Sequence, residues 1–436
     1  MNIAAISTPH GLGGIAVIRV SGPDATAIVD RHFKPHKAGH QLVGRPTHTL
    51  TFGQFTTASG EVLDDVVCSL YKAPHSFTGE DVVEISCHGS LYVQQAIMHE
   101  LTSPDSHCRL AEAGEFTRRA FSNGRMDLSQ AEAVADLIAA QTAAQHRVAI
   151  SQLKGSISQQ LDALRDQLLQ LTSLLELELD FSEEDVEFAD RTQLLKLANS
   201  IDQEVTHLSD SFAAGNAIKN GIPVAIIGAP NVGKSTLLNA LLKDDRAIVS
   251  DIQGTTRDLI EDTITLGGFL FRFIDTAGIR HTDDTIERLG IERSMLAAEK
   301  AQIILLLTEP NVDFPTINVR DDQTVIRIVN KTPEFQALNN IGIDQLEQRL
   351  VQIAQSFVSG GASDGILITN IRHKQMLDQA HCDITLVIQG LEQHLSGDLV
   401  AEDLRAVITS LNAILGRSIT SQDTLNNIFK NFCVGK

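Results

Sequence analysis

The stretch that decides the fold is Gly228-Ala229-Pro230-Asn231-Val232-Gly233-Lys234-Ser235. An apolar run, 222–227, precedes it, and a helix-like run, 236–242, follows it. Strand, glycine loop with Gly-Lys-Ser, and helix form a phosphate-binding loop in the context that it requires. We therefore expect backbone N–H groups and a helix N-terminus to hold phosphate, Lys234 to reach the β- and γ-phosphates, and Ser235 to bind Mg²⁺. The alternative, a glycine turn without a ligand, is disfavoured by the full spacing and both flanks.

Length and composition limit the possible classes of protein. With 436 residues the chain exceeds what one hydrophobic core usually supports, so two or three domains are expected. A net charge of −20 and the absence of Trp predict poor intrinsic binding to nucleic acid, so an RNA substrate would need a local patch or a partner. The five scattered cysteines fit a reducing compartment without disulfides or zinc. No signal peptide or membrane-spanning run is evident, which favours a soluble cytoplasmic protein.

Short β-rich runs predict a mixed, α+β domain over residues 1–118. Gly11–Gly14 separates the first two runs and predicts a tight hairpin, because no helix follows as a dinucleotide fingerprint would require. Arg19 and Glu84 lie within such runs, where a charge by itself is more often exposed than a ligand. The runs are Ile3–Ile6, Ile15–Val20, Val66–Tyr71 and Asp81–Cys87.

A helix-like pattern of residues begins near Ser129 and returns after Asn370. Apolar residues recur there at spacings of three and four, which predicts long helices packed on one another. The first two stripes are Ile157, Leu161, Leu164, Leu168, Leu171 and Leu175, and Leu194, Leu197, Ile201, Val205, Leu208 and Phe212. The last two are Leu377, Ala380, Ile384, Val387 and Leu391, and Leu404, Ile408, Leu411 and Leu415.

Residues 216–371 alternate between strand-like and helix-like runs. This pattern predicts a doubly wound sheet with the phosphate loop at the end of a strand. Because helical runs flank it, we expect this domain to be inserted into a helical domain with halves 119–215 and 372–436. The expected strands are Val224–Ile227, Asp262–Leu266, Phe269–Ile274, Ile303–Thr308, Thr324–Val329 and Ile366–Thr369, and the expected helices are 235–243, 287–300 and 344–357.

Three further motifs follow the loop in the order typical of GTPases. Thr256, within 254–258, can give Mg²⁺ a second hydroxyl, in a segment that hydrolysis would release. Asp275 ends the run 273–275 and can anchor the metal through water, and the Gly278 N–H can meet the γ-phosphate. Asn330-Lys331 follows a strand and is expected to pack under the base and brace the phosphate loop. The order and spacing of all four motifs favour a GTPase.

Two positions depart from the GTPase pattern. Ile279 stands where a water-positioning Gln is usual, so either hydrolysis is very slow or another residue does this work. Glu287 is the nearest candidate, with a first-turn acid favoured by the helix dipole as the alternative. Pro333 replaces an Asp that would accept two hydrogen bonds from guanine, which weakens discrimination against adenine. Glu334 could substitute after a one-residue shift, or it could simply be solvated. Ala337-Leu338-Asn339 also fits a base-binding loop poorly.

Sequence blocks outside these motifs are specific enough to compare with known families. They are 11–14 with 18–22, 76–84, 87–89, 113–121, 127–133 and the terminal Cys433-Val434-Gly435-Lys436. These blocks, which a generic GTPase lacks, closely resemble the bacterial and organellar MnmE (TrmE) family of tRNA uridine modification GTPases. The fold implied is multidomain α/β plus α: an N-terminal α+β folate-binding-type domain and a long-helix bundle interrupted by an inserted Ras-like P-loop G domain.

The resemblance implies a function for the N-terminal domain. It would be similar to folate-binding aminomethyltransferase-type domains, form a homodimer, and hold a 5-formyltetrahydrofolate-type one-carbon donor. Arg19, Glu84, Arg125 and Lys436 match the folate-contacting positions. Arg125 stands where Lys is common, a change that keeps the charge but not the shape.

The resemblance also implies partners and a second cation. Family members work with an FAD-containing partner, MnmG, in a heterotetramer that adds an aminomethyl-type group to C5 of the tRNA wobble uridine. GTP hydrolysis would use Mg²⁺ on Ser235 and Thr256, K⁺ on Asn231, Ser250, Ile252 and Thr255 in place of an arginine finger, and Glu287 to orient water. The nucleotide-binding residues expected are Asn231, Val232, Gly233, Lys234, Ser235, Thr236, Ser250, Asp251, Ile252, Gln253, Gly254, Thr255, Thr256, Asp275, Thr276, Ala277, Gly278, Asn330 and Lys331.

Cys433 has two interpretations. In the family the matching Cys is treated as functionally important, and a buried inert thiol is the alternative. A prenylation site is rejected because Gly435 and Lys436 fit that signature badly. Two other functions stay open for the chain: a ribosome-assembly GTPase switch, and a family member with a degraded base site that acts mainly as a scaffold for folate and MnmG.

Overall fold

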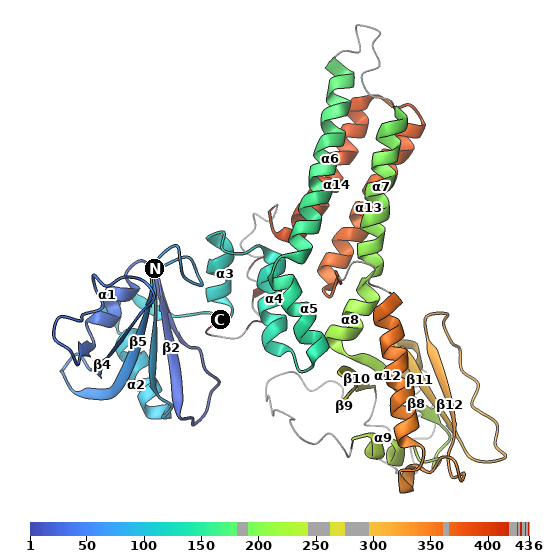
Figure 1. Cartoon of the computed structure of the whole chain (residues 1–436), viewed down its shortest axis with the longest axis horizontal. Coiled ribbons are helices and arrows are strands. Elements are labelled where there is room, and N and C mark those ends of the chain that lie inside the picture. Colours follow the sequence, from blue (N-terminus) through green and yellow to red (C-terminus); the bar gives the residue numbers. More distant parts are fainter. Residues whose placement is uncertain are drawn as a thin grey trace. The chain divides into compact units, whose positions relative to one another are not determined.

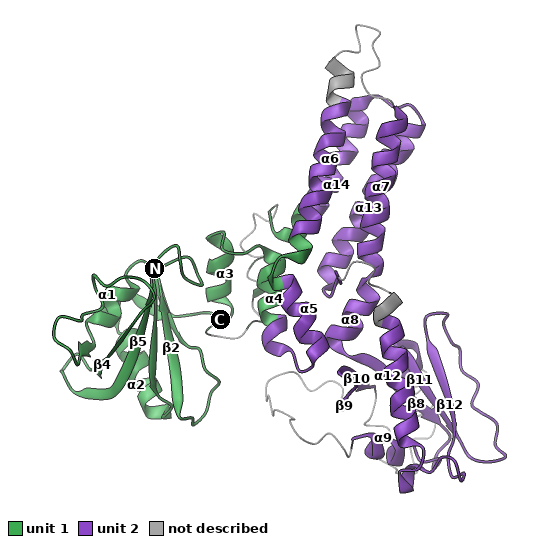
Figure 2. Cartoon of the chain, in the orientation of Figure 1, with its two compact units in different colours: residues 1–135, 153–158, 412–436 green, residues 136–152, 159–411 purple. Residues whose placement is uncertain are grey.

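The computed structural model describes residues 1–180, 191–242, 262–274, 296–360 and 366–417, with Leu425, Ile428, Phe429, Phe432 and Gly435. The chain divides into two compact units (Figure 2). Unit 1 comprises 1–135, 153–158 and 412–436, and unit 2 comprises 136–152 and 159–411. This division does not separate the helical from the nucleotide-binding segment, so the domain boundaries near 118, 215 and 371 stay predictions.

Unit 1 is built on a seven-stranded sheet in the order β3-β4-β5-β6-β2-β1-β7. Neighbouring strands are antiparallel except β1 and β7, which are parallel. The sequence predicted β1, β2, β5 and β6, but it missed the remaining strands. β1 and β2 pair antiparallel, yet residues 7–14 connect them, which is longer than the predicted tight hairpin. The strands are β1 (Asn2–Ile6), β2 (Ile15–Ser21), β3 (Phe33–Pro35), β4 (Thr49–Thr56), β5 (Val62–Tyr71), β6 (Val82–His88) and β7 (Cys108–Leu110).

The two faces of this sheet are covered differently. Helices α1 (Ala25–Asp30) and α2 (Leu91–Leu101) pack on one face and complete its apolar core. On the other face, α3 (Glu115–Ser122) places Phe116 against Ile3 and Ala5 of β1. Farther across that second face, Leu50 is 67% exposed and Phe52 is 51% exposed. The described residues therefore cover only part of the second face.

Described residues near the C-terminus also pack in unit 1. Phe429 lies against Leu128, the first residue of α4 (Leu128–Ala139). The Gly435 carbonyl accepts a hydrogen bond of 3.1 Å from the Ser7 hydroxyl, just after β1. The end of the chain therefore lies beside the strands at its beginning.

Four long helices, most of whose residues belong to unit 2, lie side by side (Figure 1). Their predicted apolar stripes are buried, except that Leu197 and Ile408 are half-buried and the adjacent Ala198 and Val407 take the buried positions. Phe212, predicted to end the second stripe, is half-buried and begins the next helix instead. No helix of the described residues is long and apolar enough to cross a membrane. The four helices are α6 (Ser156–Asp180), α7 (Arg191–Asp210), α13 (Ile371–Glu392) and α14 (Gly397–Leu415).

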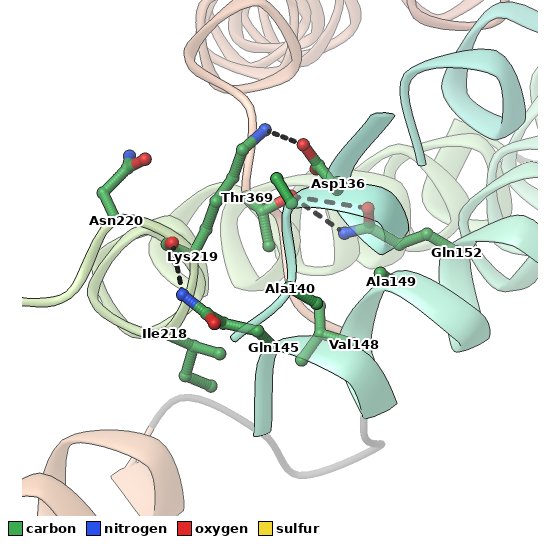
Figure 3. Close-up of a pocket in the computed structure, with 11 residues that line it drawn as sticks. Asp136, Ala140, Gln145, Val148, Ala149, Gln152, Ile218, Lys219, Asn220 and Thr369 are labelled. Atoms are coloured by element: carbon green, nitrogen blue, oxygen red, sulfur yellow. Dashed lines mark hydrogen bonds and ion pairs between the residues drawn. The ribbon is translucent and has the colours of Figure 1, made fainter. Parts of the chain in front are cut away.

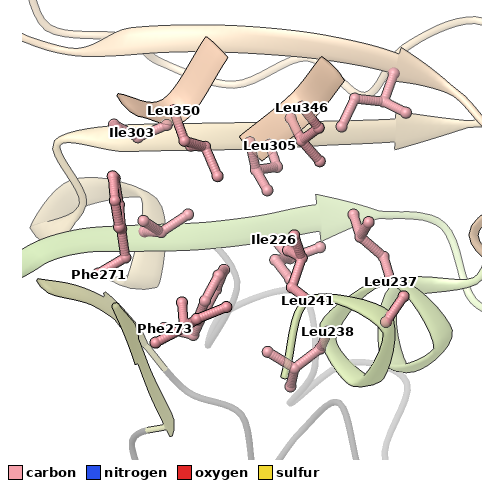
Figure 4. Packing of buried hydrophobic residues seen from close by; sticks show 14 of the residues in the cluster. Ile226, Leu237, Leu238, Leu241, Phe271, Phe273, Ile303, Leu305, Leu346 and Leu350 are labelled. Atoms are coloured by element: carbon pink, nitrogen blue, oxygen red, sulfur yellow. The ribbon is translucent and has the colours of Figure 1, made fainter. Parts of the chain in front are cut away.

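The second sheet has the order β12-β11-β8-β10-β9 and lies, in chain order, between α8 (Phe212–Asn220) and α13. Its strands are parallel apart from the antiparallel β9–β10 pair. Helices α9 (Lys234–Leu242) and α12 (Ile343–Gly360) cover one face, where Leu237, Leu305 and Leu346 share a core (Figure 4). The strands are β8 (Ile222–Gly228), β9 (Asp262–Leu266), β10 (Phe269–Phe273), β11 (Ile303–Thr308) and β12 (Thr324–Val329), close to the predicted ranges.

The predicted strand Ile366–Thr369 is wrong. Side chains of neighbouring helices, not a strand, satisfy this backbone: Ile368 N–H donates to the Ser211 hydroxyl at 3.1 Å, and the Leu367 carbonyl accepts from Gln152 Nε2 at 2.9 Å. Gly215, expected near a helix end, instead lies inside α8 and lets the segment approach. A Cβ at Gly215 would lie 2.1 Å from the Ile368 oxygen.

Candidate functional site

The phosphate loop joins β8 to α9 and depends on two glycines. A Cβ at Gly228 would lie 2.5 Å from the Leu307 carbonyl oxygen of the neighbouring strand β11. Gly233 has φ +99°, and a Cβ there would lie 2.4 Å from Asn330 Nδ2. Both positions exclude a side chain because of neighbouring protein atoms, in addition to any approach of phosphate.

Lys234 is folded back into the loop. Its ammonium donates to the carbonyls of Gly228 and Ala229, each at 2.8 Å, and burial lowers its pKa from the ordinary value. Phosphate oxygens entering the loop can take over these hydrogen bonds. Ser235 and Thr236 follow as half-buried residues in the first turn of α9, the position expected for a hydroxyl that meets Mg²⁺.

Asn330 and Lys331 brace the loop from the end of β12. Asn330 is 4% exposed; its Nδ2 donates to the Val232 carbonyl at 2.9 Å, and its Oδ1 accepts from the Ala337 N–H at 3.1 Å. Lys331 Nζ lies 3.5 Å from the Asn231 carbonyl oxygen and pairs with Glu309. The structure thus joins the first and last of the four predicted motifs.

The other predicted nucleotide-site residues lie outside the described part of the chain. Within the described part, no cluster of three or more His, Cys, Asp or Glu side chains could hold a metal. Those outside it are Ser250, Asp251, Ile252, Gln253, Gly254, Thr255, Thr256, Asp275, Thr276, Ala277, Gly278 and Glu287, and likewise Cys433 and Lys436 of the C-terminus.

Arg19 and Glu84 form an ion pair across β2 and β6, where they stand directly opposite each other. Arg19 donates to Glu84 Oε1 from Nε at 3.0 Å and from Nη2 at 2.7 Å, and the side chains are only 16% and 25% exposed. Arg19 also lies over the Phe77 and Phe116 rings and, at 3.4 Å, donates to the Gly435 carbonyl. The pair is therefore held in place rather than being two exposed strand charges.

A pocket of about 430 Å³ lies next to this pair in unit 1. Phe77 lines it and also contacts Arg19, so the predicted Arg125 in its lining is brought into the same region. No pattern in the sequence indicates the two histidines or the tyrosine there. The lining residues are His48, Tyr71, His75, Ser76, Phe77 and Arg125.

Two family models together match nearly the whole chain. The N-terminus of the GTP-binding protein TrmE matches residues 2–125, and the MnmE helical domain matches residues 128–433. The chain belongs to the MnmE family. The family predicted from the sequence is therefore confirmed, as is the enzyme class, a GTP hydrolase.

Full-length relatives support the same family assignment. The tRNA modification GTPase MnmE of Parabacteroides distasonis is 51% identical over 463 aligned residues, which cover 100% of this chain and 99% of the relative. The protein of the same name from Porphyromonas gingivalis is 48% identical over 468 residues, covering 100% and 98%. Both alignments are longer than the 436-residue chain, so these relatives contain residues that it lacks.

A network that the sequence did not predict joins residues of two sequence blocks, 76–84 and 113–121. Glu115 is 2% exposed and accepts hydrogen bonds from Arg109 at 2.6 and 2.7 Å and from Arg119 at 3.1 Å. Burial alone would raise the pKa of the Glu115 carboxyl, but these donors hold that pKa below its ordinary value. Arg119 also pairs with Glu80 at 2.9 Å, and Glu80 accepts from Ser21 of β2. The network fixes the loop that carries Phe77.

A smaller cavity, of about 120 Å³, lies in unit 2 (Figure 3), and no residue of the phosphate loop lines it. Asp136 and Lys219 pair at 2.8 Å, and Gln145, from α5 (Ala143–Leu153), donates to the Lys219 carbonyl at 2.9 Å. Gln152 bonds to Thr369 in the same lining. These polar groups are bonded to one another. The rest of the cavity wall is mostly aliphatic and includes Val148 and Ile218. The cavity therefore lacks the phosphate chemistry of the loop.

The described cysteines are free thiols. Cys68, Cys87 and Cys108 are buried, and Cys382 is exposed. Burial raises the pKa of Cys87 and that of Cys108 to about 11. Burial also raises the pKa of Cys68. Buried thiols with raised pKa values are poor nucleophiles, so we expect these three thiols to react slowly.

Proposed function

We propose that the chain is a K⁺-dependent GTPase that works with the FAD-containing partner MnmG. Together they would add an aminomethyl-type group to C5 of the wobble uridine of certain tRNAs, with a folate as the one-carbon donor. One observation carries the proposal: a chain of the MnmE family holds both a braced phosphate loop and, in its other unit, the Arg19–Glu84 pair beside Gly435.

The GTPase part of the proposal rests on the loop. Ser235 and Thr256 would bind Mg²⁺, and Asn231, Ser250, Ile252 and Thr255 would bind K⁺. The exposed Asn231 side chain at the tip of the loop fits a cation ligand. K⁺ would neutralise charge that develops between the phosphates. Glu287 would orient the attacking water in place of the missing Gln.

The folate part rests on unit 1. Folates combine a flat heteroaromatic ring with carboxylates, and the region offers the aromatic rings of Phe77 and Tyr71 and the guanidinium of Arg125. Arg19, Glu84, Arg125 and Lys436 would hold the folate, which supplies the one-carbon unit when bound.

A homodimer through the N-terminal domain is supported by the open face of the first sheet. The strand register puts Leu50, Ser69, Glu84 and Arg19 in one row on this face. The exposed Leu50 and its neighbour Phe52 would be covered by a second copy. Dimers would join MnmG in a heterotetramer in the cytoplasm, and the partner would grip the tRNA that so acidic a chain repels.

The test compares GTP hydrolysis by the full chain in KCl and NaCl. We expect much faster hydrolysis in K⁺ and loss of hydrolysis in Lys234→Ala; equal rates in the two salts would contradict the K⁺ role. Mass spectrometry of wobble nucleosides from a strain without the gene tests the modification. Unaltered wobble uridines in that strain would favour the ribosome-assembly alternative, and altered uridines with no measurable GTP hydrolysis would favour the scaffold alternative.

A further inference from the structure

The phosphate side and the base side of the nucleotide site are built very differently. On the phosphate side, Asn330 and Lys331 bond to the loop carbonyls of Val232 and Asn231. Glu309 pairs with Lys331, so this carboxylate is already engaged in holding the lysine. The contacts that Asn330 and Lys331 make with the loop therefore use no side chain from residues 332–342, although the Ala337 N–H helps to hold the Asn330 amide.

The base side consists of a closed turn. Thr332 N–H donates to the Phe335 carbonyl at 3.1 Å, and Phe335 N–H donates to the Thr332 carbonyl at 3.3 Å and to its hydroxyl at 3.1 Å. Pro333 and Glu334 lie at the exposed tip of this turn. Pro333 has no side-chain acceptor and no N–H, so the position that would read guanine carries no hydrogen-bonding group of its own except its carbonyl.

After this turn, Ala337 contacts Asn330, the residue that braces the phosphate loop. The Ala337 N–H is bonded to Asn330 Oδ1, so this donor serves the protein rather than a base. Leu338, in the short 3-10 helix η3 (Ala337–Asn339), is 81% exposed and offers an apolar contact. In the described part of the chain β12 is the last strand of the sheet, and α12 begins at Ile343. We take the 332–342 segment as the base side because it directly follows the brace. Its polar side chains include Asn339 and Gln336, which bond to each other, and no carboxylate stands at position 333.

We propose that this site holds nucleotides mainly through their phosphates and binds other purine nucleoside triphosphates, ATP and ITP, alongside GTP. The inference rests on the proposed nucleotide site and deepens it. The Lys331 stem and Leu338 contact any purine ring, because stacking and apolar contact do not distinguish the edge groups of the base. A site that hydrogen-bonds a substrate group rejects an analogue lacking it by about 10⁴-fold or more. Without that bond the discrimination falls to about 100-fold or less.

Competition against a fluorescent GTP analogue on the full chain tests this inference. We expect GTP, ITP and ATP to compete with dissociation constants within about 100-fold of one another, and UTP to compete more weakly because its ring is smaller. ITP is the sharpest probe, since it lacks only the 2-amino group that a guanine-reading carboxylate would bind. A preference for GTP over ITP or ATP of more than about 100-fold would overturn the inference.

Three variants show which residues determine the preference among the purine nucleotides. Pro333→Asp should raise the preference for GTP over ATP by at least about tenfold, and an unchanged ratio would contradict a base-reading role for position 333. Glu334→Gln should leave the ratio unchanged, whereas a selective loss of GTP binding would show that Glu334 reads guanine and refute the inference. Lys234→Ala should weaken all three triphosphates equally. If the wild-type chain bound none of them, the proposed function would fail as well, whereas strong guanine preference would refute the inference alone.

Discussion

Replacing Glu115 by Gln should destabilise unit 1 strongly although the two side chains have nearly the same shape. Glu115 is 2% exposed and accepts hydrogen bonds from Arg109 to both of its oxygens, from Arg119, and from the Glu112 N–H. A carboxamide has one acceptor oxygen and one NH₂ group. Whichever way it turns, the NH₂ group faces guanidinium donors.

The expected cost follows from the burial of this carboxylate. Breaking a buried charge pair on one side typically costs about 3–5 kcal/mol. Arg109 is 36% exposed and can recover some hydration, so we expect the lower end, about 3 kcal/mol. For a unit of this size, that loss lowers the melting temperature by about 6–12 °C.

Tyrosine fluorescence can follow unit 1 selectively. The chain has no Trp, and its two tyrosines, Tyr71 and Tyr92, both belong to unit 1. Glu112→Gln is the matched control, because Glu112 is 62% exposed and also pairs with an arginine; its effect should stay below about 1 kcal/mol. A melting temperature of Glu115→Gln within about 2 °C of the control, which corresponds to about 1 kcal/mol or less for a unit of this size, would refute the reasoning.

The same variant predicts a pH dependence. The folded-state pKa of Glu115 lies below its ordinary value, which is about 4.3 in the unfolded chain. The carboxylate therefore contributes its full stabilisation above that unfolded value and loses it as the pH falls through the folded-state pKa. The stability difference between wild type and Glu115→Gln should be constant near neutral pH and shrink in acid. A difference that grows in acid would contradict the assignment.

Three other predictions concern unit 2 and the thiols. Gly215→Ala places a Cβ 2.1 Å from the Ile368 oxygen and should cost about 1–3 kcal/mol in far-UV circular dichroism melts; Gly13→Ala, with its nearest atom at 3.5 Å, should not. Asn330→Ala removes the bonds to Val232 and Ala337 and should weaken GTP binding by about 2 kcal/mol in titration calorimetry; unchanged affinity would show that the brace is dispensable. Alkylation at neutral pH, read by peptide mass spectrometry, should modify Cys382 well before Cys68, Cys87 or Cys108, and equal labelling would contradict their burial.

The sequence predicted the elements whose periodicity is strong. The stripe from Leu161 to Leu175 is buried as expected, because a long helix in a bundle has one apolar face and no competing signal. β8 to β12 were also found, since each is a short apolar run between turn residues. Ile366–Thr369 failed because an apolar, β-branched run reads as a strand, whereas Ser211 and Gln152 supply the hydrogen bonds that a strand partner would give.

The sequence predicted some residues of the candidate sites and missed others. The phosphate loop was visible because its spacing is local, and Asn330 could be placed on it through the order of the motifs. The Glu115 network could not be derived, because it joins residues from separate strands and a helix that only the fold brings together. The pocket residues His48 and His75 were missed for the same reason.

The position of β12 has a consequence for how the protein behaves before it is fully folded. Among the described residues β12 is the outermost strand of its sheet, and it reads Thr324-Val325-Ile326-Arg327-Ile328-Val329. An open edge of this composition invites pairing with another chain. Arg327, exposed in the middle of the strand, is the one charge that opposes such pairing within it. Its loss would make the protein more prone to aggregate during refolding while leaving the native fold intact.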